Sequence, residues 1–141
     1  MSEEHSTPVD FRVAQVTHVL HDYGLATSAV VLREVEGARR EISIPVALPD
    51  ATTIYQAWHH LVGRRPTSNE LMALVLQEVH ADVIASRIVR LDAGIYFAEL
   101  DLMTTRGRRV FDCRPSDAIA VALRQPVPAP LLIAEDVLAI D

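Results

Sequence analysis

One segment of the chain dominates the pattern: Asp112-Cys113-Arg114-Pro115-Ser116-Asp117-Ala118-Ile119-Ala120-Val121-Ala122-Leu123. Pro115 suits the first position of a helix, where its missing N–H costs nothing. Because every residue from Ala118 to Leu123 is apolar, this helix has no polar stripe and must be buried on most sides. We therefore expect the rest of the protein to pack around a helix over 115–124.

Alternating apolar and polar residues predict strands on both sides of two further helices. The predicted strands cover 10–18, 28–35, 42–46, 83–91, 95–103, 108–112 and 131–134. The first nine residues are expected to form a flexible tail. Residues 10–141 are expected to form a single α+β domain with a mixed or antiparallel sheet and three main helices. The predicted order is βββ-αα-βββ-α-β, with a last helical turn over 135–140.

The first of the two middle helices is predicted to begin at Asp50 as its cap, after Pro49 has ended a strand. Its apolar residues from Ile54 to Leu61 recur at helical spacing on one face. Gly63 fits the position just past the end of this helix.

The second middle helix is predicted over 68–79. Thr67 and Glu70 have the spacing of a capping box, in which each side chain bonds the backbone N–H of the other residue. Leu71, Leu74 and Val75 then share one face, as in an amphipathic helix.

The composition indicates one globular domain. The chain has 141 residues, of which 50% are hydrophobic and 23% charged. Its single cysteine, Cys113, excludes an internal disulfide and an all-cysteine zinc site. No apolar run approaches the roughly 20 residues that span a membrane, and the polar N-terminus is unlike a signal peptide. We therefore expect a soluble, cytoplasmic protein.

The charge balance bears on the expected partners. Thirteen cations, all of them arginine, stand against 19 anions, for a formal net charge of −6. An acidic surface repels phosphate backbones, so contact with DNA or RNA would need a local arginine cluster or a bound metal. The high apolar content favours a homo-oligomer, and a dimer is the default.

Two carboxylates and an arginine meet at the expected junction of strand and helix. Asp112 and Asp117 could hold a hard cation such as Mg²⁺, which prefers oxygen ligands. Arg114, beside a helix N-terminus, could bind a phosphate with its planar fork. The same residues also fit a structural role, in which Asp117 faces the helix dipole and holds Arg114 as an ion pair. Both interpretations remain open from the residues alone.

Glu99 and Asp101 lie two residues apart, so they share one face of a strand. The pair could join a metal site if Asp112 lay on the neighbouring strand. The simpler prediction is that both carboxylates lie on the solvated face of an antiparallel sheet.

The remaining reactive side chains are poorly arranged for chemistry. The adjacent His59 and His60 diverge on a helix, so neither they nor the other histidines suggest zinc. Cys113 lies near a helix N-terminus, which can lower a thiol pKa, but without a paired base it is expected to be a buried, inert thiol. The sequence contains no glycine-rich phosphate loop, no Gly-x-Ser-x-Gly elbow and no His-Glu-x-x-His motif.

The run from Arg114 to Ala120, followed by Ala122-Leu123-Arg124, resembles the bifunctional nuclease domain family of bacteria and plants. The resemblance extends through about residues 10–138 and includes Ile95-Tyr96-Phe97-Ala98. It implies a compact, oligomeric α+β domain and cleavage of both DNA and RNA. On this basis the candidate catalytic residues are Asp112, Arg114 and Asp117, of which Asp112 and Asp117 would hold Mg²⁺ or Mn²⁺. Arg124, Ser116 and Asn69 are the candidate substrate-binding residues.

The chain departs from the family pattern at four positions. Asn69-Glu70 replace a His-Asp pair, and Ala47 and Ser43 replace a glycine and a proline. Histidine can transfer protons near pH 7 whereas asparagine cannot, so a possible catalytic group is missing. Two functions therefore remain open: a metal-dependent nuclease, or a non-enzymatic binding or regulatory module that keeps the family fold.

Overall fold

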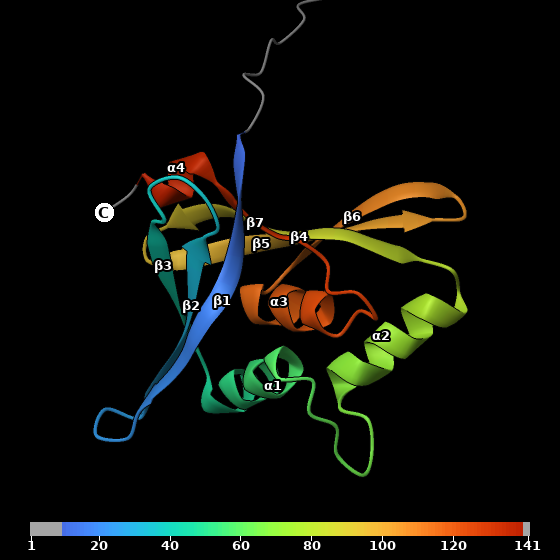
Figure 1. The fold of residues 1–141 in the computed structure, drawn as a ribbon, viewed down its shortest axis with the longest axis horizontal. Helices are drawn as coiled ribbons and strands as arrows, with labels where there is room; N and C mark the ends of the chain where they lie inside the picture. The colour runs from blue at the N-terminus through green and yellow to red at the C-terminus, as the bar shows by residue number, and fades with distance from the viewer. Residues whose placement is uncertain (1–9, 140–141) are drawn as a thin grey trace, which may run out of the picture.

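The protein folds as a seven-stranded sheet with three helices packed against one side, as the computed structural model in Figure 1 shows. The strands are β1 (Phe11–Asp22), β2 (Thr27–Glu34), β3 (Glu41–Val46), β4 (Asp82–Asp92), β5 (Ile95–Thr104), β6 (Gly107–Cys113) and β7 (Leu131–Ala134), and the helices are α1 (Leu48–Trp58), α2 (Ser68–Glu78), α3 (Pro115–Leu123) and α4 (Glu135–Leu138). The structure describes residues 10–139. The predicted tail over 1–9 and the last two residues of the predicted domain lie outside the described residues.

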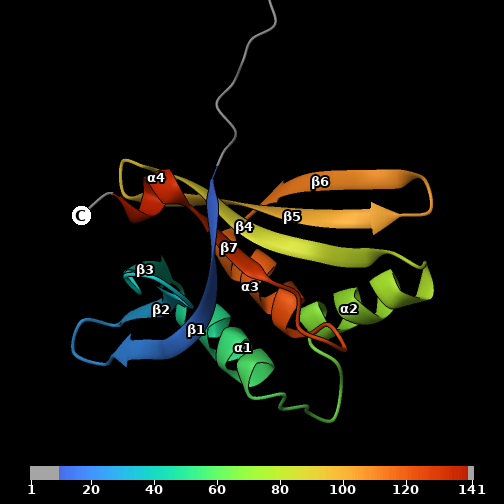
Figure 2. The same ribbon diagram turned by 45° about the horizontal axis from the view of Figure 1, so that its top comes forward.

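The sheet joins two antiparallel meanders through a single short strand. Its order is β3-β2-β1-β7-β4-β5-β6. Strand β7 pairs antiparallel with β1 and parallel with β4, which makes the sheet mixed. Figure 2 shows that the strands of the first meander lie at a steep angle to those of the second, with β7 between the two sets. The predicted single α+β domain and its element order are confirmed.

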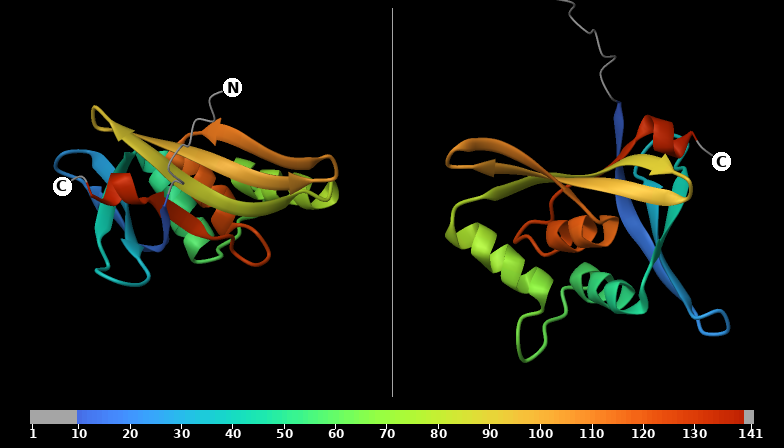
Figure 3. Two further views of the ribbon diagram at one scale, coloured as in Figure 1. Left: turned by 90° about the horizontal axis from the view of Figure 1, so that it is seen from above. Right: turned by 180° about the vertical axis from the view of Figure 1, so that it is seen from behind.

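Helix α3 forms the centre of the core, as predicted from its apolar sequence. It packs against α1 on one side and against β4 and β5 on the other, an arrangement that Figure 3 shows from behind. Ala118, Ala120 and Ala122 are buried, and their small side chains let the helix backbone approach the sheet. The hydroxyl of Ser86 on β4 donates a hydrogen bond of 2.6 Å to the carbonyl of Ala118.

Helix α1 begins and ends earlier than predicted. It starts at Leu48, so that Pro49 lies within its first turn, where proline is tolerated, and Asp50 is not the cap. It ends before Gly63 because His60 adopts a left-handed backbone conformation with φ of 55°. The amide of Leu61 then bonds back to Gln56 at 2.8 Å, which closes the helix end.

Helix α2 has the predicted limits to within one residue. The capping box is confirmed, because Thr67 and Glu70 each accept a hydrogen bond of 3.3 Å from the other's backbone N–H. The helix ends at a second left-handed histidine, His80.

The apolar face indicated for α2 is not the buried one. Leu71, Leu74 and Val75 are about half exposed, whereas Ala73 and Leu76 are buried. Leu76 belongs to a small second core with Leu102 and Val121, at the far end of β5. Because α2 touches the domain only along this narrow line, Leu71, Leu74 and Val75 remain exposed.

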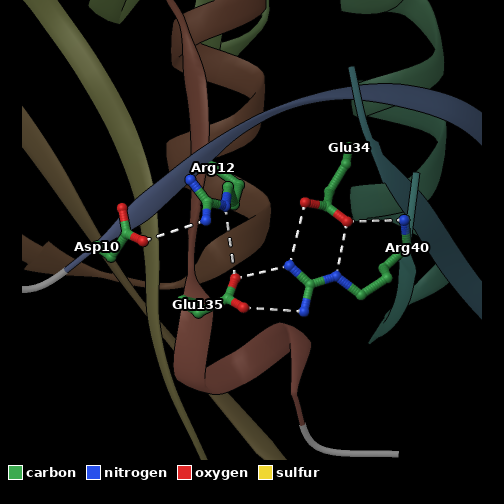
Figure 4. A network of polar contacts seen from close by, with 5 residues as sticks. All are labelled: Asp10, Arg12, Glu34, Arg40 and Glu135. Carbon is green, nitrogen blue, oxygen red and sulfur yellow. Dashed lines mark hydrogen bonds and ion pairs between the residues drawn. The ribbon is translucent and has the colours of Figure 1, made fainter. Parts of the chain in front are cut away.

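A polar network ties the C-terminal segment to the first meander (Figure 4). Arg40, after the β2–β3 turn, donates to Glu34 at 2.7 Å and to Glu135 of α4 at 2.6 Å. Arg12 lies 3.2 Å from Asp10 and 3.6 Å from Glu135. Hydrogen bonding by Arg40 lowers the pKa of the Glu34 carboxyl despite its burial. The network therefore holds α4 against the hairpin that precedes α1.

We predict that truncating the centre of α3 is far more costly than truncating its end. Ile119→Ala is expected to lower the free energy of unfolding by about 2–5 kcal/mol, because the side chain is fully enclosed. Leu123→Ala is expected to cost less, because Leu123 is only partly buried. Denaturant midpoints, compared at equal slopes, measure both effects. An unchanged midpoint for Ile119→Ala would contradict the central position of α3.

Candidate functional site

A cavity lies at the N-terminal end of α3. Its volume is about 630 Å³. It is bordered by the ends of β3 and β6, the first turn of α1 and the start of β5. Its polar rim consists of Asp50, Asp112, Arg114 and Ser116, and its apolar wall includes Ile44, Ile95, Tyr96 and Phe97. Cavities of this kind, mostly apolar with a few convergent polar groups, are common ligand sites.

Arg114 is held between two carboxylates at the mouth of this cavity. It is the N-cap residue of α3 and donates to both oxygens of Asp117, at 2.9 and 3.0 Å. A third donor reaches Asp50 of α1 at 3.2 Å. Hydrogen bonding by Asp117 and the charge of Asp50 raise the pKa of the guanidinium. The ion pair that the sequence suggested between Arg114 and Asp117 is therefore present in the structure. The arginine side chain is nevertheless largely exposed.

Asp112 lies apart from this ion pair. It is exposed on β6, directly opposite Glu99 on β5. It lines the same cavity as Arg114, but no ion pair or hydrogen bond links its carboxylate to another described side chain. Asp112 is thus a carboxylate available for a ligand at the cavity rim.

Asp117 and Asn69 border a second, smaller cavity between α2, α3 and β5. Its volume is about 360 Å³. Cys113 lines both cavities, so the two lie on either side of it. The structure therefore divides the predicted catalytic residues, with Asp112 and Arg114 at one cavity and Asp117 extending into the next, beside Asn69.

The two other predicted substrate-binding residues lie in different places. Ser116 is buried in the first turn of α3 and lines the larger cavity. Arg124 lies at the opposite end of α3, where its side chain is only 7% exposed. It donates a 2.6 Å hydrogen bond to the carbonyl of Leu61 and lies 3.5 Å from Glu70. Arg124 therefore joins the α1–α2 loop to the core, and it lines neither of the two cavities described above.

The prediction that Glu99 and Asp101 both face solvent holds for only one of the two residues. Glu99 is partly exposed, but the side chain of Asp101 is 1% exposed. Arg108 donates to it twice, at 2.9 and 2.7 Å, and Arg87 lies 2.6 Å away. These two guanidinium groups lower the pKa of the Asp101 carboxyl in spite of its burial. The prediction of a solvated face is wrong for Asp101, because arginines on both neighbouring strands cover it.

Among residues 10–139, no three His, Cys, Asp or Glu side chains are grouped so that they could hold a metal ion. Mg²⁺, however, usually takes only one or two carboxylates and completes its shell with water and substrate phosphates. Asp112, at an open cavity rim, fits such a partial site.

Comparison with known proteins identifies the family of the chain. Residues 30–141, well over half of the chain, match the sequence pattern of the bifunctional nuclease domain. The chain belongs to the bifunctional nuclease domain family. The matched region contains both cavities and begins within β2, so β1 lies before it. No curated protein matches the sequence.

The structure shows one partner of Arg114 that the sequence did not indicate. The segment from Arg114 to Asp117 lies where the two cavities meet. Asp50 was missed as a partner of Arg114, because 64 positions separate the two residues. In the part of the chain that the structure describes, no helix has the length and apolar character needed to cross a membrane.

We predict that the protonation of Asp101 lowers the stability of the protein in acid. Because its folded pKa is lowered, its contribution is complete above the reference value of 3.8 and is lost as the pH falls below it. Asp101→Asn is expected to cost about 3–5 kcal/mol at neutral pH, since it leaves two arginines uncompensated. Melting curves at several pH values should show the difference between parent and variant shrinking in acid. A difference that is independent of pH would contradict this assignment.

We also predict that Cys113 reacts slowly in the folded protein. Burial, together with the charges of Asp117, Asp112 and Glu99, raises the pKa of its thiol to about 11. The thiolate is the reacting species, so alkylation by iodoacetamide at pH 8 should be on the order of 100-fold slower than in the denatured chain. Equal rates in the folded and denatured states would show that the thiol is neither buried nor perturbed.

Proposed function

We propose that this protein hydrolyses phosphodiester bonds of single-stranded DNA or RNA at the larger cavity, with the help of Mg²⁺ or Mn²⁺. The observation that carries the proposal is that one cavity presents an unengaged carboxylate, Asp112, and an arginine, Arg114, beside two aromatic side chains. These are the groups needed to recruit a cation, to bind a phosphate and to stack a base.

The local charge explains the requirement for a cation. Asp50 and Asp117 hold the guanidinium of Arg114, and Asp112 lines the same cavity, so these three carboxylates and one arginine have a formal sum of −2. This sum repels a bare phosphodiester, and the net charge of −6 on the whole chain adds to the repulsion. A divalent cation held by Asp112 would offset the local sum of −2, and when bound it supplies Lewis acidity and a water of lowered pKa.

The protein's own groups would position the substrate. Arg114 can exchange its single 3.2 Å bond to Asp50 for a phosphate oxygen while Asp117 keeps the guanidinium in place. The hydroxyl of Ser116 and the N-terminal end of α3 lie on the same wall and favour a negative charge. Tyr96 offers ring surface to a nucleobase, whereas one face of the Phe97 ring is covered by the guanidinium of Arg90, 4.0 Å from the ring centroid.

A binding module without catalysis is the second candidate. Asn69, which takes the position of a histidine in the family pattern, lies beside Asp117 and cannot act as a base. Both oxygens of Asp117 are also occupied by Arg114. These two observations favour a protein that keeps the phosphate-binding arginine and performs little or no chemistry.

We predict weak, metal-dependent cleavage that requires both rim residues. Purified protein is incubated with single-stranded RNA and DNA in Mg²⁺, Mn²⁺ or chelator. Arg114→Gln is expected to lower the rate by about 10²–10³-fold, as for loss of a group that stabilises transition-state charge. Asp112→Asn should abolish cleavage, whereas Asp82→Asn, an exposed carboxylate at the start of β4, should leave it unchanged. Asn69→His should raise the rate if the missing histidine is what limits it.

The controls separate the two candidate functions. Cleavage that survives chelator and Asp112→Asn in a folded protein would overturn the proposed site. Absence of cleavage in every variant, combined with strand binding that Arg114→Gln abolishes, would establish the binding module instead. Melting curves of each variant confirm that the fold is retained.

A further inference from the structure

The loop between α1 and α2, residues 59–67, carries unpaired positive charge on an acidic chain. Residues 51–69 are the longest stretch of the sequence without an aspartate or glutamate, and they include Arg64 and Arg65. Figure 1 shows the loop projecting from the domain, on the side of the helices away from the sheet. Both arginines are exposed, and neither forms an ion pair or hydrogen bond with another residue of 10–139. The loop therefore presents two free guanidinium groups to a polyanion.

The same loop is fixed at both ends. Arg124, whose side chain is 7% exposed, donates a 2.6 Å hydrogen bond to the carbonyl of Leu61. At the other end, the capping box of Thr67 and Glu70 fixes the start of α2. Glu70 is the acidic residue nearest to the arginines in the sequence, but its side chain is largely buried, 3.5 Å from Arg124. The loop is thus ordered in advance, which lowers the entropic cost of binding.

Three aromatic rings lie together at the end of α1 from which this loop leaves. The ring centroid of His59 is 4.4 Å from that of Tyr55 and 4.4 Å from that of Trp58. Tyr55 is 46% exposed and His59 is exposed, whereas Trp58 is partly buried and packs against the core. Exposed rings that are held on a helix offer flat surface on which a nucleobase can stack.

We propose that single-stranded DNA or RNA binds to this surface, formed by Tyr55, His59, Arg64 and Arg65 and called here the α1 end surface. Bases stack on the two exposed rings, and the two arginines bind phosphates on either side of them. None of the four residues lines either of the cavities described above, so the surface is a second site. The choice of a nucleic-acid strand as ligand rests on the proposed function.

The composition of the surface favours a single strand over other polyanions. An acidic peptide would pair with the arginines but leave the exposed rings without a planar partner. An anionic membrane would be repelled by the net charge of −6 on the chain. In a duplex the bases are already stacked on one another, so the rings would have no free base to contact. A single strand supplies both phosphates and accessible bases.

The α1 end surface would supply affinity that the rim of the larger cavity lacks. Asp50 at the start of α1 lines that cavity, and Trp58 ends the helix. At 1.5 Å per residue the two lie about 12 Å apart along the helix axis, a distance that a strand of several nucleotides can cover. Because the rim carries a formal sum of −2, we infer that a strand is held mainly at the α1 end surface.

The test measures binding in the presence of chelator, so that cleavage does not interfere. Trp58 is the only tryptophan of the chain, and its fluorescence reports directly on the surface. Titration of the parent with oligothymidylate is expected to quench Trp58. The anisotropy of a labelled oligothymidylate should rise over the same range of concentration.

Two kinds of variant separate the phosphate contacts from the stacking contacts. The double variant Arg64→Gln, Arg65→Gln removes two phosphate contacts, so the slope of log affinity against log salt should become shallower by about 1.4. Tyr55→Ala should weaken binding by about 5–150-fold with an unchanged slope, because stacking releases no counterions. Tyr55→Phe keeps the ring and should bind as the parent does.

Matched controls lie at other exposed turns. Arg39→Gln removes an exposed arginine from the β2–β3 turn, and Tyr23→Ala removes a tyrosine that is 88% exposed on the β1–β2 turn. Both variants should bind with the affinity and the salt dependence of the parent. Melting curves of every variant show that the fold is retained.

The proposal is overturned if the parent binds no strand, if binding leaves Trp58 emission unchanged, or if the double arginine variant and Tyr55→Ala both bind as the parent does. Polyglutamate that binds as tightly as the strand at the same salt would assign the surface to an acidic peptide instead. The proposed function fails separately. If strands quench Trp58 but are never cleaved, the surface stands and the nuclease does not, whereas cleavage that the surface variants leave unchanged, without quenching, rejects the surface alone.

Discussion

The whole structure depends on the burial of α3 on nearly all sides. An apolar helix of this kind is stable only if a sheet covers one face and another helix the opposite face. Its alanines let the backbone come close enough to β4 for Ser86 to bond the carbonyl of Ala118 at 2.6 Å. Strand β7 then bridges the two meanders above it. If α3 were displaced, β4 and β5 would lose the helix that covers them, and α1, which packs on β1 and β2, would lose its partner.

The position of α3 also creates the candidate site. Its N-terminus must follow directly from β6, so Arg114 lies at the point where a strand end, a helix start and the first turn of α1 converge. The cavity is open there because the helix cannot fill the corner between two meanders. Arg114 is consequently held by carboxylates from two helices, Asp117 of α3 and Asp50 of α1. The same strand, β6, that supplies Asp112 to the rim also forms the open edge of the sheet.

Local patterns in the sequence predicted the elements well and the exposed faces less well. The capping box at Thr67 and the proline at the first position of α3 were correct, because each depends on residues within one helical turn. The end of α1 was wrong because a histidine, His60, adopts the conformation usually taken by glycine. The prediction that Asp101 is exposed to solvent was wrong, because the local pattern contains no information about Arg87, which lies on another strand.

By itself the sequence determined the order of elements, the burial of α3, the family and the short motif from Asp112 to Asp117. These depend on periodicity and on residues close together in the chain. Only the tertiary structure decided which residues share a cavity, because Asp50 meets Arg114 across 64 positions. It also decided that Leu71, Leu74 and Val75 of α2 are exposed, since amphipathic spacing defines a face but not what covers it. Packing between distant segments carries this information, and no local pattern encodes it.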